Sequence, residues 1–233
     1  MKTIGLIGGM SWESSAHYYR LINQAVRQRL GGQHNARSLL LSVDFAEVEA
    51  WQVQGDWHRL AECMARAAQQ LEAAGAGCIV LCTNTMHKVA DTLGAASSLP
   101  LLHIADATGD ALRAAGHQRI GLLGTRYTME QDFYRGRLEQ RHGLQVLTPD
   151  AAARVQLHDI IYRELCQGII RAASRKTLQI MIDELQREGA QAVVLGCTEI
   201  GLLIGQADVA LPVFDTTALH AEAAVRWYLD GAY

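Results

Sequence analysis

The stretch Ile4-Gly5-Leu6-Ile7-Gly8 occurs a second time, 116 residues later, as Ile120-Gly121-Leu122-Leu123-Gly124. Two further segments return in the same order after 114 and 112 residues: 75–81 (GAGCIVL) as 189–195 (GAQAVVL), and 99–102 (LPLL) as 211–214 (LPVF). Matches in one order and at nearly one offset indicate an internal repeat. The alternative is that strands of α/β proteins simply resemble one another, since a glycine before a Val/Leu run is common.

Both halves of the chain alternate short apolar runs with longer segments of helical periodicity. The apolar runs predict strands at 3–7, 39–43, 78–81, 119–123, 144–147 and 192–195. The periodic segments predict helices at 18–30, 60–74, toward 93, and at 133–141, 160–168 and 177–188. This alternation is typical of a parallel sheet covered by helices. We therefore predict an α/β protein of two similar halves, residues 1–115 and 116–233, with a C-terminal helix over 215–230 that packs on the first half.

The composition argues against several classes of function. Of the 233 residues, 49% are hydrophobic, which is enough to form a buried core. The 21 basic and 24 acidic residues give a net charge of −3 and are scattered, so no basic face is available for nucleic acid. No apolar run approaches the roughly 20 residues of a membrane helix, and no signal-peptide pattern is visible. We expect a cytoplasmic protein with neither a nucleic-acid nor a membrane partner.

The five cysteines are odd in number, widely spaced and without a C-x-x-C pair. This pattern argues against a disulfide framework and against a structural zinc site. Three of them, Cys63, Cys78 and Cys166, lie inside predicted helices or strands, where we expect them to contribute packing.

The loops that follow the repeated strands are the place to look for chemistry, because ligands of parallel sheets sit beyond the carboxyl ends of the strands. These loops read Cys82-Thr83-Asn84-Thr85 and Gly196-Cys197-Thr198-Glu199. The offset of 114 residues pairs Thr83, and not Cys82, with Cys197. A cysteine at a strand end is more often a small buried hydrophobe than a reactive thiol, and the polar residues could instead cap the next helix. Free amides at a helix N-terminus can also bind a carboxylate, so capping and binding are compatible.

The glycine-rich turn at 5–14 raises the question of a dinucleotide site. It lacks the G-x-G-x-x-G spacing, and Asp44 is only a weak candidate for the acidic residue of such a site. We favour a tight turn whose backbone amides face a small anion. The histidines form no H-E-x-x-H pattern, and His87 could either line a helix or carry protons.

Five segments together resemble the aspartate/glutamate racemase family: 4–10, 82–87 (CTNTMH), 102–108 (LHIADAT), 124–129 (GTRYTM) and 196–201 (GCTEIG). The resemblance covers essentially the whole chain, and is strongest to the bacterial L-aspartate/glutamate-specific racemases, whose first loop also reads Cys-Thr-Asn-Thr. It implies two pseudo-symmetric Rossmann-like domains with the substrate in the interdomain cleft. It also implies an amino-acid racemase that needs neither pyridoxal phosphate nor a metal.

In most of that family the two loops supply a pair of cysteines. Here Thr83 takes the place of the first cysteine, in agreement with the internal repeat, and Cys197 takes the place of the second. The resemblance implies a two-base mechanism in which Cys197 removes the α-proton of the L enantiomer and Thr83 protonates the opposite face. We expect surrounding dipoles to bring the pKa of Cys197 near neutrality from its ordinary value of roughly 8.5, whereas a threonine hydroxyl is a far weaker acid. L-substrates should therefore be preferred.

The resemblance also assigns six residues to substrate binding: Met10, Gln52, Asn84, Thr85, Thr198 and Glu199. Gln52 and Cys166 stand where aspartate racemases often have an arginine and a lysine, which would hold an acidic side chain. Their absence leaves open whether aspartate, glutamate or another amino acid is the substrate.

Two other interpretations stay open. A decarboxylase or hydantoin racemase of the same superfamily would use one cysteine, in keeping with the difference between Thr83 and Cys197. A small-ligand binding protein would have lost turnover with its first cysteine, although Cys197 with Thr198 and Glu199 argues against this. The sequence does not decide the oligomeric state, and a homodimer is one possibility.

Overall fold

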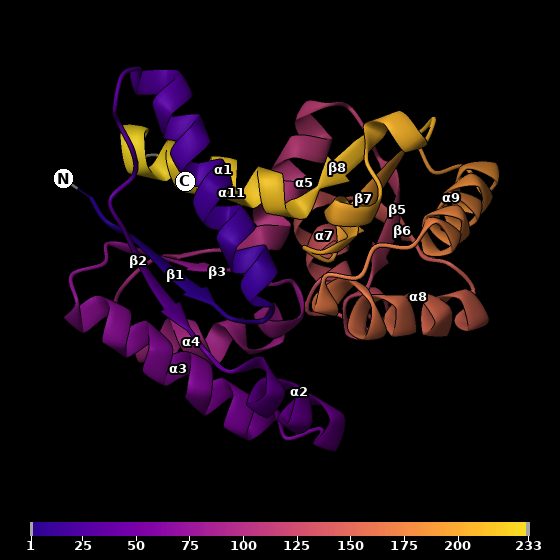
Figure 1. The fold of residues 1–233 in the computed structure, drawn as a ribbon. Coiled ribbons are helices and arrows are strands. Elements are labelled where there is room, and N and C mark those ends of the chain that lie inside the picture. The colour runs from indigo at the N-terminus through magenta and orange to yellow at the C-terminus, as the bar shows by residue number, and fades with distance from the viewer. Residues whose placement is uncertain (1, 232–233) are drawn as a thin grey trace. The chain divides into compact units, whose positions relative to one another are not determined.

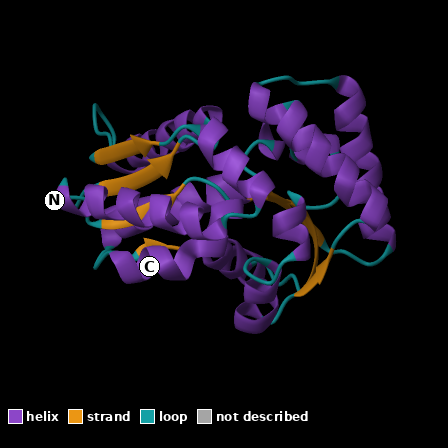
Figure 2. Cartoon of the chain, turned by 90° about the horizontal axis from the view of Figure 1, so that it is seen from below, coloured by secondary structure: helices purple, strands orange, loops and turns teal. Residues whose placement is uncertain are grey.

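The computed structural model of the protein describes residues 2–231 (Figure 1). By its internal contacts the chain divides into two compact units, one holding the residues up to Ile104 and those from His220 onward, the other Ala105–Leu219. Each unit contains a four-stranded parallel sheet, in the order β2-β1-β3-β4 and β6-β5-β7-β8. Helices (purple) lie around the strands (orange) in Figure 2. The predicted α/β fold is thereby confirmed, and the sequence repeat is a repeat of strand order.

The contact division falls at the start of α5 (Ile104–Ala114), whereas the sequence repeat draws its boundary near residue 115, after this helix. The repeat carries no marker inside α5, because the matching segments are strands. Residues 232 and 233, the end of the predicted second half, lie outside the described residues.

The first unit covers its sheet with helices on both faces (Figure 1). Its strands are β1 (Ile4–Gly8), β2 (Ser38–Ser42), β3 (Cys78–Leu81) and β4 (Leu101–Leu102). One face packs against α1 (Trp12–Leu30) and α11 (Thr216–Asp230), and the other against α2 (Phe45–Gln54), α3 (Trp57–Ala73), η1 (Thr85–Val89) and α4 (Ala90–Ala96). Alternate residues of a strand face opposite ways, so Cys78, Val80 and Cys82 pack toward α1 and α11, while Ile79 and Leu81 pack toward α3.

The second unit repeats this plan with different helix lengths. Its strands are β5 (Arg119–Gly124), β6 (Gln145–Leu147), β7 (Ala192–Gly196) and β8 (Val213–Asp215). Around them lie α5, α6 (Arg126–Glu130), α7 (Arg135–His142), α8 (Ala151–Arg163), η2 (Leu165–Gln167), α9 (Ala172–Arg187), α10 (Ile200–Leu203) and η3 (Gln206–Asp208).

Several helices begin before the residues that periodicity predicts. Helix α1 begins at Trp12, because Ser11 caps it and accepts a hydrogen bond from the Ser14 amide. Helix α8 begins at Ala151, where Asp150 accepts from the Ala153 amide at 2.8 Å. Periodicity detects the apolar face of a helix and misses its polar first turn. It also misses the short helices and the two- and three-residue strands β4 and β8.

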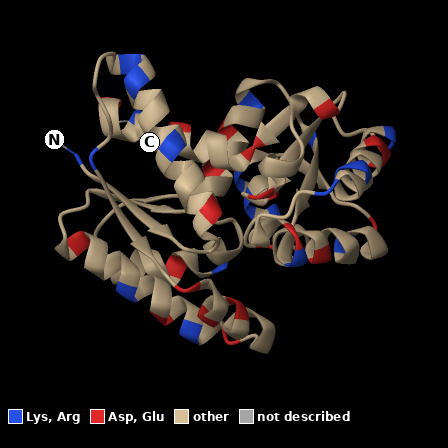
Figure 3. Ribbon diagram, in the orientation of Figure 1, with Lys and Arg blue, Asp and Glu red and all other residues tan. Residues whose placement is uncertain are grey.

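Lysine and arginine residues are interspersed with aspartate and glutamate along the helices of each unit (Figure 3). In the part of the chain that the structure describes, no helix combines the length and apolar character needed to cross a bilayer.

Candidate active site

The first polar loop begins where β3 ends. The Cys82 amide donates to the Ile7 carbonyl at 2.9 Å, and the Thr83 amide donates to the Leu81 carbonyl at 2.8 Å. Thr83, Asn84 and Thr85 then follow at the carboxyl edge of the sheet, with only 7%, 3% and 6% of their surfaces exposed. Three adjacent polar residues are thus held in a nearly closed environment.

Cys82 belongs to the core and not to this polar group. It is fully buried, and it packs in the cluster that contains Ile4 and Tyr18. Its Sγ atom lies 3.7 Å from the Val80 carbonyl, and burial holds the pKa of the thiol far above its ordinary value. Cys82 therefore acts as a packing residue, as the alternation along β3 predicts.

The second polar loop follows β7 and contains a carboxylate with two donors. The Cys197 Sγ donates to Glu199 Oε2 at 3.0 Å, and the Thr198 hydroxyl donates to the same oxygen at 2.9 Å. All three residues are at least nine-tenths buried. This arrangement can move a proton between the thiol and the carboxylate.

The pKa of Cys197 lies well above its ordinary value. Burial is the largest cause, and the Glu199 carboxylate and the Cys166 sulfur raise the pKa further. The prediction of a thiol poised near neutrality by surrounding dipoles is therefore wrong for the protein without substrate, because the nearest polar partner is an anion. The thiol is the resting form.

The sequence predicts that Cys166 only contributes packing inside a helix or strand, but it lies in the short 3-10 helix η2 and is only partly buried. Its sulfur is close enough to Cys197 to influence that thiol electrostatically. The sequence indicates that Cys166 lies near the site, because it stands where aspartate racemases often have a lysine. Cys78 is buried in β3 as expected, while Cys63 is partly exposed on α3.

Strand pairing tests the equivalence of Thr83 and Cys197 directly. Ile4 pairs with Cys78 in the first sheet, and the repeat partners Ile120 and Ala192 pair in the second. The same holds at β4 and β8, where Val80 pairs with Leu102 and Val194 with Phe214. Counting along β3 and β7 from these pairs places Thr83 and Cys197 at corresponding positions, each just beyond its strand. The shift of one residue that would pair Cys82 with Cys197 is excluded.

The remaining predicted binding residues of the first unit lie near one another. Met10 follows β1 and packs in the core cluster that contains Met86. Gln52, at 4% exposure, donates from Nε2 to the Met86 Sδ at 3.3 Å. Met86 comes directly after Thr85, so Gln52 lies beside the same loop.

The glycine turn after β1 is tight, as predicted, but one of its amides is already used. Gly9 has a positive φ of 97°, and its amide donates to the Ser15 hydroxyl at 2.8 Å. Asp44 caps α2 by accepting from the Ala46 amide at 3.0 Å. Because the Gly9 amide is bonded to Ser15 and Asp44 caps a helix, neither residue is arranged as in a dinucleotide site.

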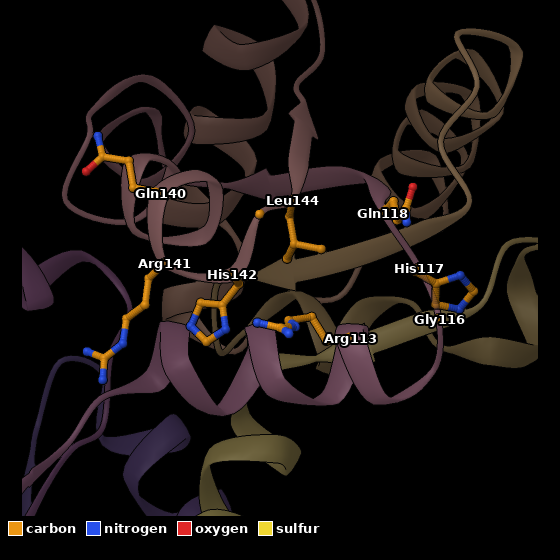
Figure 4. Close-up of a pocket in the computed structure, with 9 residues that line it drawn as sticks. Arg113, Gly116, His117, Gln118, Gln140, Arg141, His142 and Leu144 are labelled. Atoms are coloured by element: carbon orange, nitrogen blue, oxygen red, sulfur yellow. The ribbon is translucent and has the colours of Figure 1, made fainter.

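A cavity of about 540 Å³ lies in the second unit (Figure 4). Its residues precede β5 and β6, whereas Cys197 follows β7, so the cavity is at the other edge of the sheet from Cys197. Its walls come from the ends of α5 and α7 and from the residues that lead into β5 and β6. Its basic side chains, Arg113, Arg141 and His142, occupy the last turns of those two helices. Positive charge there complements the partial negative charge of the helix C-termini. We therefore do not assign the chemistry to this cavity.

Asp106 of α5 anchors the same region. Both its oxygens accept from Arg137 at 2.7 Å, and Oδ1 also accepts from His142 Nε2 at 3.1 Å. Burial alone would raise the pKa of Asp106, but the Arg137 and His142 hydrogen bonds, with the charges of Arg137 and Arg141, hold it below its ordinary value. Within residues 2–231, no group of three His, Cys, Asp or Glu side chains is placed to bind a metal.

Comparison with known proteins identifies the class. The family model described as Asp/Glu/Hydantoin racemase matches residues 7–224. The chain therefore belongs to the Asp/Glu/hydantoin racemase family, which confirms the predicted resemblance and places it among the isomerases.

Individual relatives agree with this assignment. A Yersinia pestis protein provisionally described as an Asp/Glu racemase superposes with a TM-score of 0.91, at 55% identity over 98% of this chain and 100% of that one. An aspartate racemase homologue from Pyrococcus horikoshii OT3 superposes with a TM-score of 0.84, at 32% identity over 98% of this chain and 99% of that one. The broad specificity amino-acid racemase RacX of Bacillus subtilis is 22% identical over 174 residues, or 75% of this chain and 74% of that protein.

Proposed function

We propose that this protein racemises an acidic amino acid, L-aspartate or L-glutamate, without a cofactor. In this proposal Thr83 and Cys197 act on opposite faces of the α-carbon. The observation that carries the proposal is the Cys197 thiol, hydrogen-bonded to Glu199 at the strand-end position that corresponds to Thr83.

The first proton transfer uses Cys197 and Glu199. The carboxylate of Glu199 accepts the thiol proton across the 3.0 Å hydrogen bond, and the thiolate then removes the α-proton of the L enantiomer. Because opposite charge favours an anion, a substrate ammonium group near the thiol would lower the cost of forming the thiolate. Glu199 thus has a role in proton transfer beyond the substrate binding that the family resemblance implies.

The second proton transfer uses Thr83. Its hydroxyl donates a proton to the opposite face of the carbanion, and the alkoxide regains a proton from water. Glu199 releases its proton to solvent, so the cycle inverts the α-carbon with no net change in protons. A threonine alkoxide is a high-energy base, which supports a preference for L-substrates.

Substrate binding is assigned to the buried polar residues around these two groups. Asn84 and Thr85 flank Thr83, and Thr198 flanks Cys197, all at the carboxyl edges of their sheets. In a site from which water is excluded, hydrogen bonds from such groups to the substrate carboxylate are strengthened. Gln52 offers an amide, not a cation, to an acidic side chain, so we expect weaker discrimination against neutral amino acids.

The test is the incorporation of solvent deuterium at the α-carbon, measured by NMR on a panel of L- and D-amino acids. L-aspartate or L-glutamate should incorporate deuterium fastest, with undiminished rate after exhaustive chelation and with no pyridoxal absorbance. Incorporation that stops in chelator and returns with added metal would contradict the proposal, and so would a panel in which no amino acid exchanges. Loss of CO₂ from a malonate in place of exchange would favour the one-cysteine alternative.

A further inference from the structure

His87 makes two hydrogen bonds that fix its tautomer and join the Thr83 loop to the end of the neighbouring strand. Its Nδ1 lies 2.7 Å from the Thr83 carbonyl, and its Nε2 lies 3.2 Å from the Ile104 amide nitrogen. A backbone amide can only donate, so Nε2 is the acceptor and Nδ1 carries the hydrogen. The neutral imidazole therefore donates to Thr83 and accepts from Ile104. With 2% of its surface exposed, it has little room to turn.

The surroundings of His87 hold the ring in place. The His103 ring lies against it at 4.5 Å between centroids, and the His220 ring meets it edge-on at 5.9 Å. His220 is itself fixed, because its Nε2 donates to the Leu102 carbonyl at 2.7 Å and its Nδ1 accepts from the Tyr18 hydroxyl at 2.9 Å. The imidazole that contacts Thr83 is thus part of a rigid buried cluster.

Thr83 depends on this contact because it lies beyond the regular sheet. Parallel pairing of β1 with β3 ends at Leu81, and Cys82 adds one further bond to Ile7. The Thr83 carbonyl is outside that ladder, and the His87 imidazole supplies its donor. The hydrogen bond to His87 fixes the peptide group that follows the Thr83 α-carbon, and so restrains the backbone that carries the Thr83 side chain.

The second unit has no counterpart of this imidazole. The position 114 residues after His87 is Gly201, where an added Cβ would come within 2.7 Å of the Asp215 carboxylate. The Cys197 side chain is instead hydrogen-bonded within its own loop, to Glu199. The histidine therefore serves the threonine side of the site alone.

We propose that His87 is a positioning residue that aims the Thr83 hydroxyl at one face of the substrate α-carbon. This inference rests on the proposed racemase function. It predicts a change in the ratio of inversion to retention at the α-carbon, because Cys197 acts on the L face without help from His87. Loss of His87 should impair protonation from the Thr83 face, while proton removal and return by Cys197 continue.

The experiment starts from the L-amino acid in D₂O and measures two rates. One is deuterium incorporation into L-substrate that retains its configuration, and the other is formation of the D enantiomer. We expect His87→Ala to lower the ratio of inversion to retention by about tenfold or more, since small misplacements of a reacting group are costly. His87→Asn keeps an N–H near the Nδ1 position and should retain most of the ratio, whereas His87→Gln, with its amide near the Nε2 position, should behave like alanine.

The matched control is His142→Gln, which removes a buried histidine of the second unit and should leave the ratio unchanged. If His87→Ala does not fold, the Asn and Gln variants decide between the outcomes. A ratio equal to wild type in His87→Gln, or an equal fall in the Asn and Gln variants, would overturn the inference while leaving the racemase proposal intact. A wild-type protein that incorporates no deuterium would instead overturn both.

Discussion

The two polar loops follow equivalent strands in equivalent register, yet they hold different chemical groups by different means. In the first, Thr83 is held through its backbone, by the imidazole of His87. In the second, the side chain of Cys197 is held, by Glu199 two residues later. The repeated fold gives the two side chains corresponding positions, and in the proposed mechanism the local polar partners determine what each can do with a proton.

The difference is also one of acidity. A thiol beside a carboxylate can pass its proton to that carboxylate, whereas a threonine hydroxyl has no acid of comparable strength to replace it. In the proposed mechanism the Cys197 side can accordingly work in both directions, and the Thr83 side is suited to donation.

The largest effect is expected from Cys197→Ala. Deuterium exchange at the α-carbon of the L enantiomer should fall by about 10³-fold or more, because the variant removes the base on that face. The measurement is NMR of the α-position in D₂O. Cys166→Ala is the control, since Cys166 raises the Cys197 pKa but has no proton-transfer step in the proposed mechanism, so its loss should change the rate far less. Equal losses in the two variants would show that the base has been misassigned.

Acid should destabilise the first unit through His220. Burial lowers the pKa of His220 to about 4, so the folded protein excludes a proton that the unfolded chain binds below about pH 6.5. Stability should therefore fall as the pH drops from about 6.5 to 4, by about 3 kcal/mol in all. Asp106, whose folded pKa is lowered, keeps its stabilising effect in that window and loses it only below about pH 4.

All four tryptophans lie in the first unit, at positions 12, 51, 57 and 227. Urea unfolding followed by tryptophan fluorescence at pH 7 and pH 5 therefore reports the unit that contains His220. His220→Gln keeps a donor for the Leu102 carbonyl without titrating, and should flatten the pH dependence. An unchanged slope in this variant would place the titrating group elsewhere.

Thr83→Cys should make the two sides of the site more alike. A thiol in this position can act as a base on the D enantiomer, so deuterium exchange from D-substrate should rise by about tenfold to a hundredfold. Thr83→Ser keeps a hydroxyl and is the matched control, expected to retain the preference for the L enantiomer. If exchange from the D enantiomer stays at the wild-type rate in Thr83→Cys, the side chain at 83 does not face the α-carbon.

The sequence predicts the strands and their repeat well, because a buried parallel strand is a short run of Val, Leu and Ile that periodicity detects. It also predicts the register that pairs Thr83 with Cys197, since strand-end positions can be counted. It does not reveal that His87 contacts the Thr83 carbonyl and the Ile104 amide, because the second contact joins residues 17 apart through the end of another strand. The raised pKa of Cys197 is hidden for a similar reason, since it depends on burial and on the direction of the Glu199 side chain.

The smallest effect is expected from Cys82→Ala, and it tests whether Thr83 or Cys82 is the first catalytic residue. Cys82 is fully buried among apolar residues, so removing its sulfur should cost about 1 to 2 kcal/mol of unfolding free energy. The α-proton exchange rate should stay close to wild type. Cys78→Ala removes a buried sulfur from the same face of β3 and should behave alike in urea unfolding and in exchange. If Cys82→Ala were as inactive as Cys197→Ala while Thr83→Ala remained active, Cys82 would be the first catalytic residue. The two units would then carry matching thiols one residue out of register, and the difference between their loops would lie in the backbone and not in the choice of side chain.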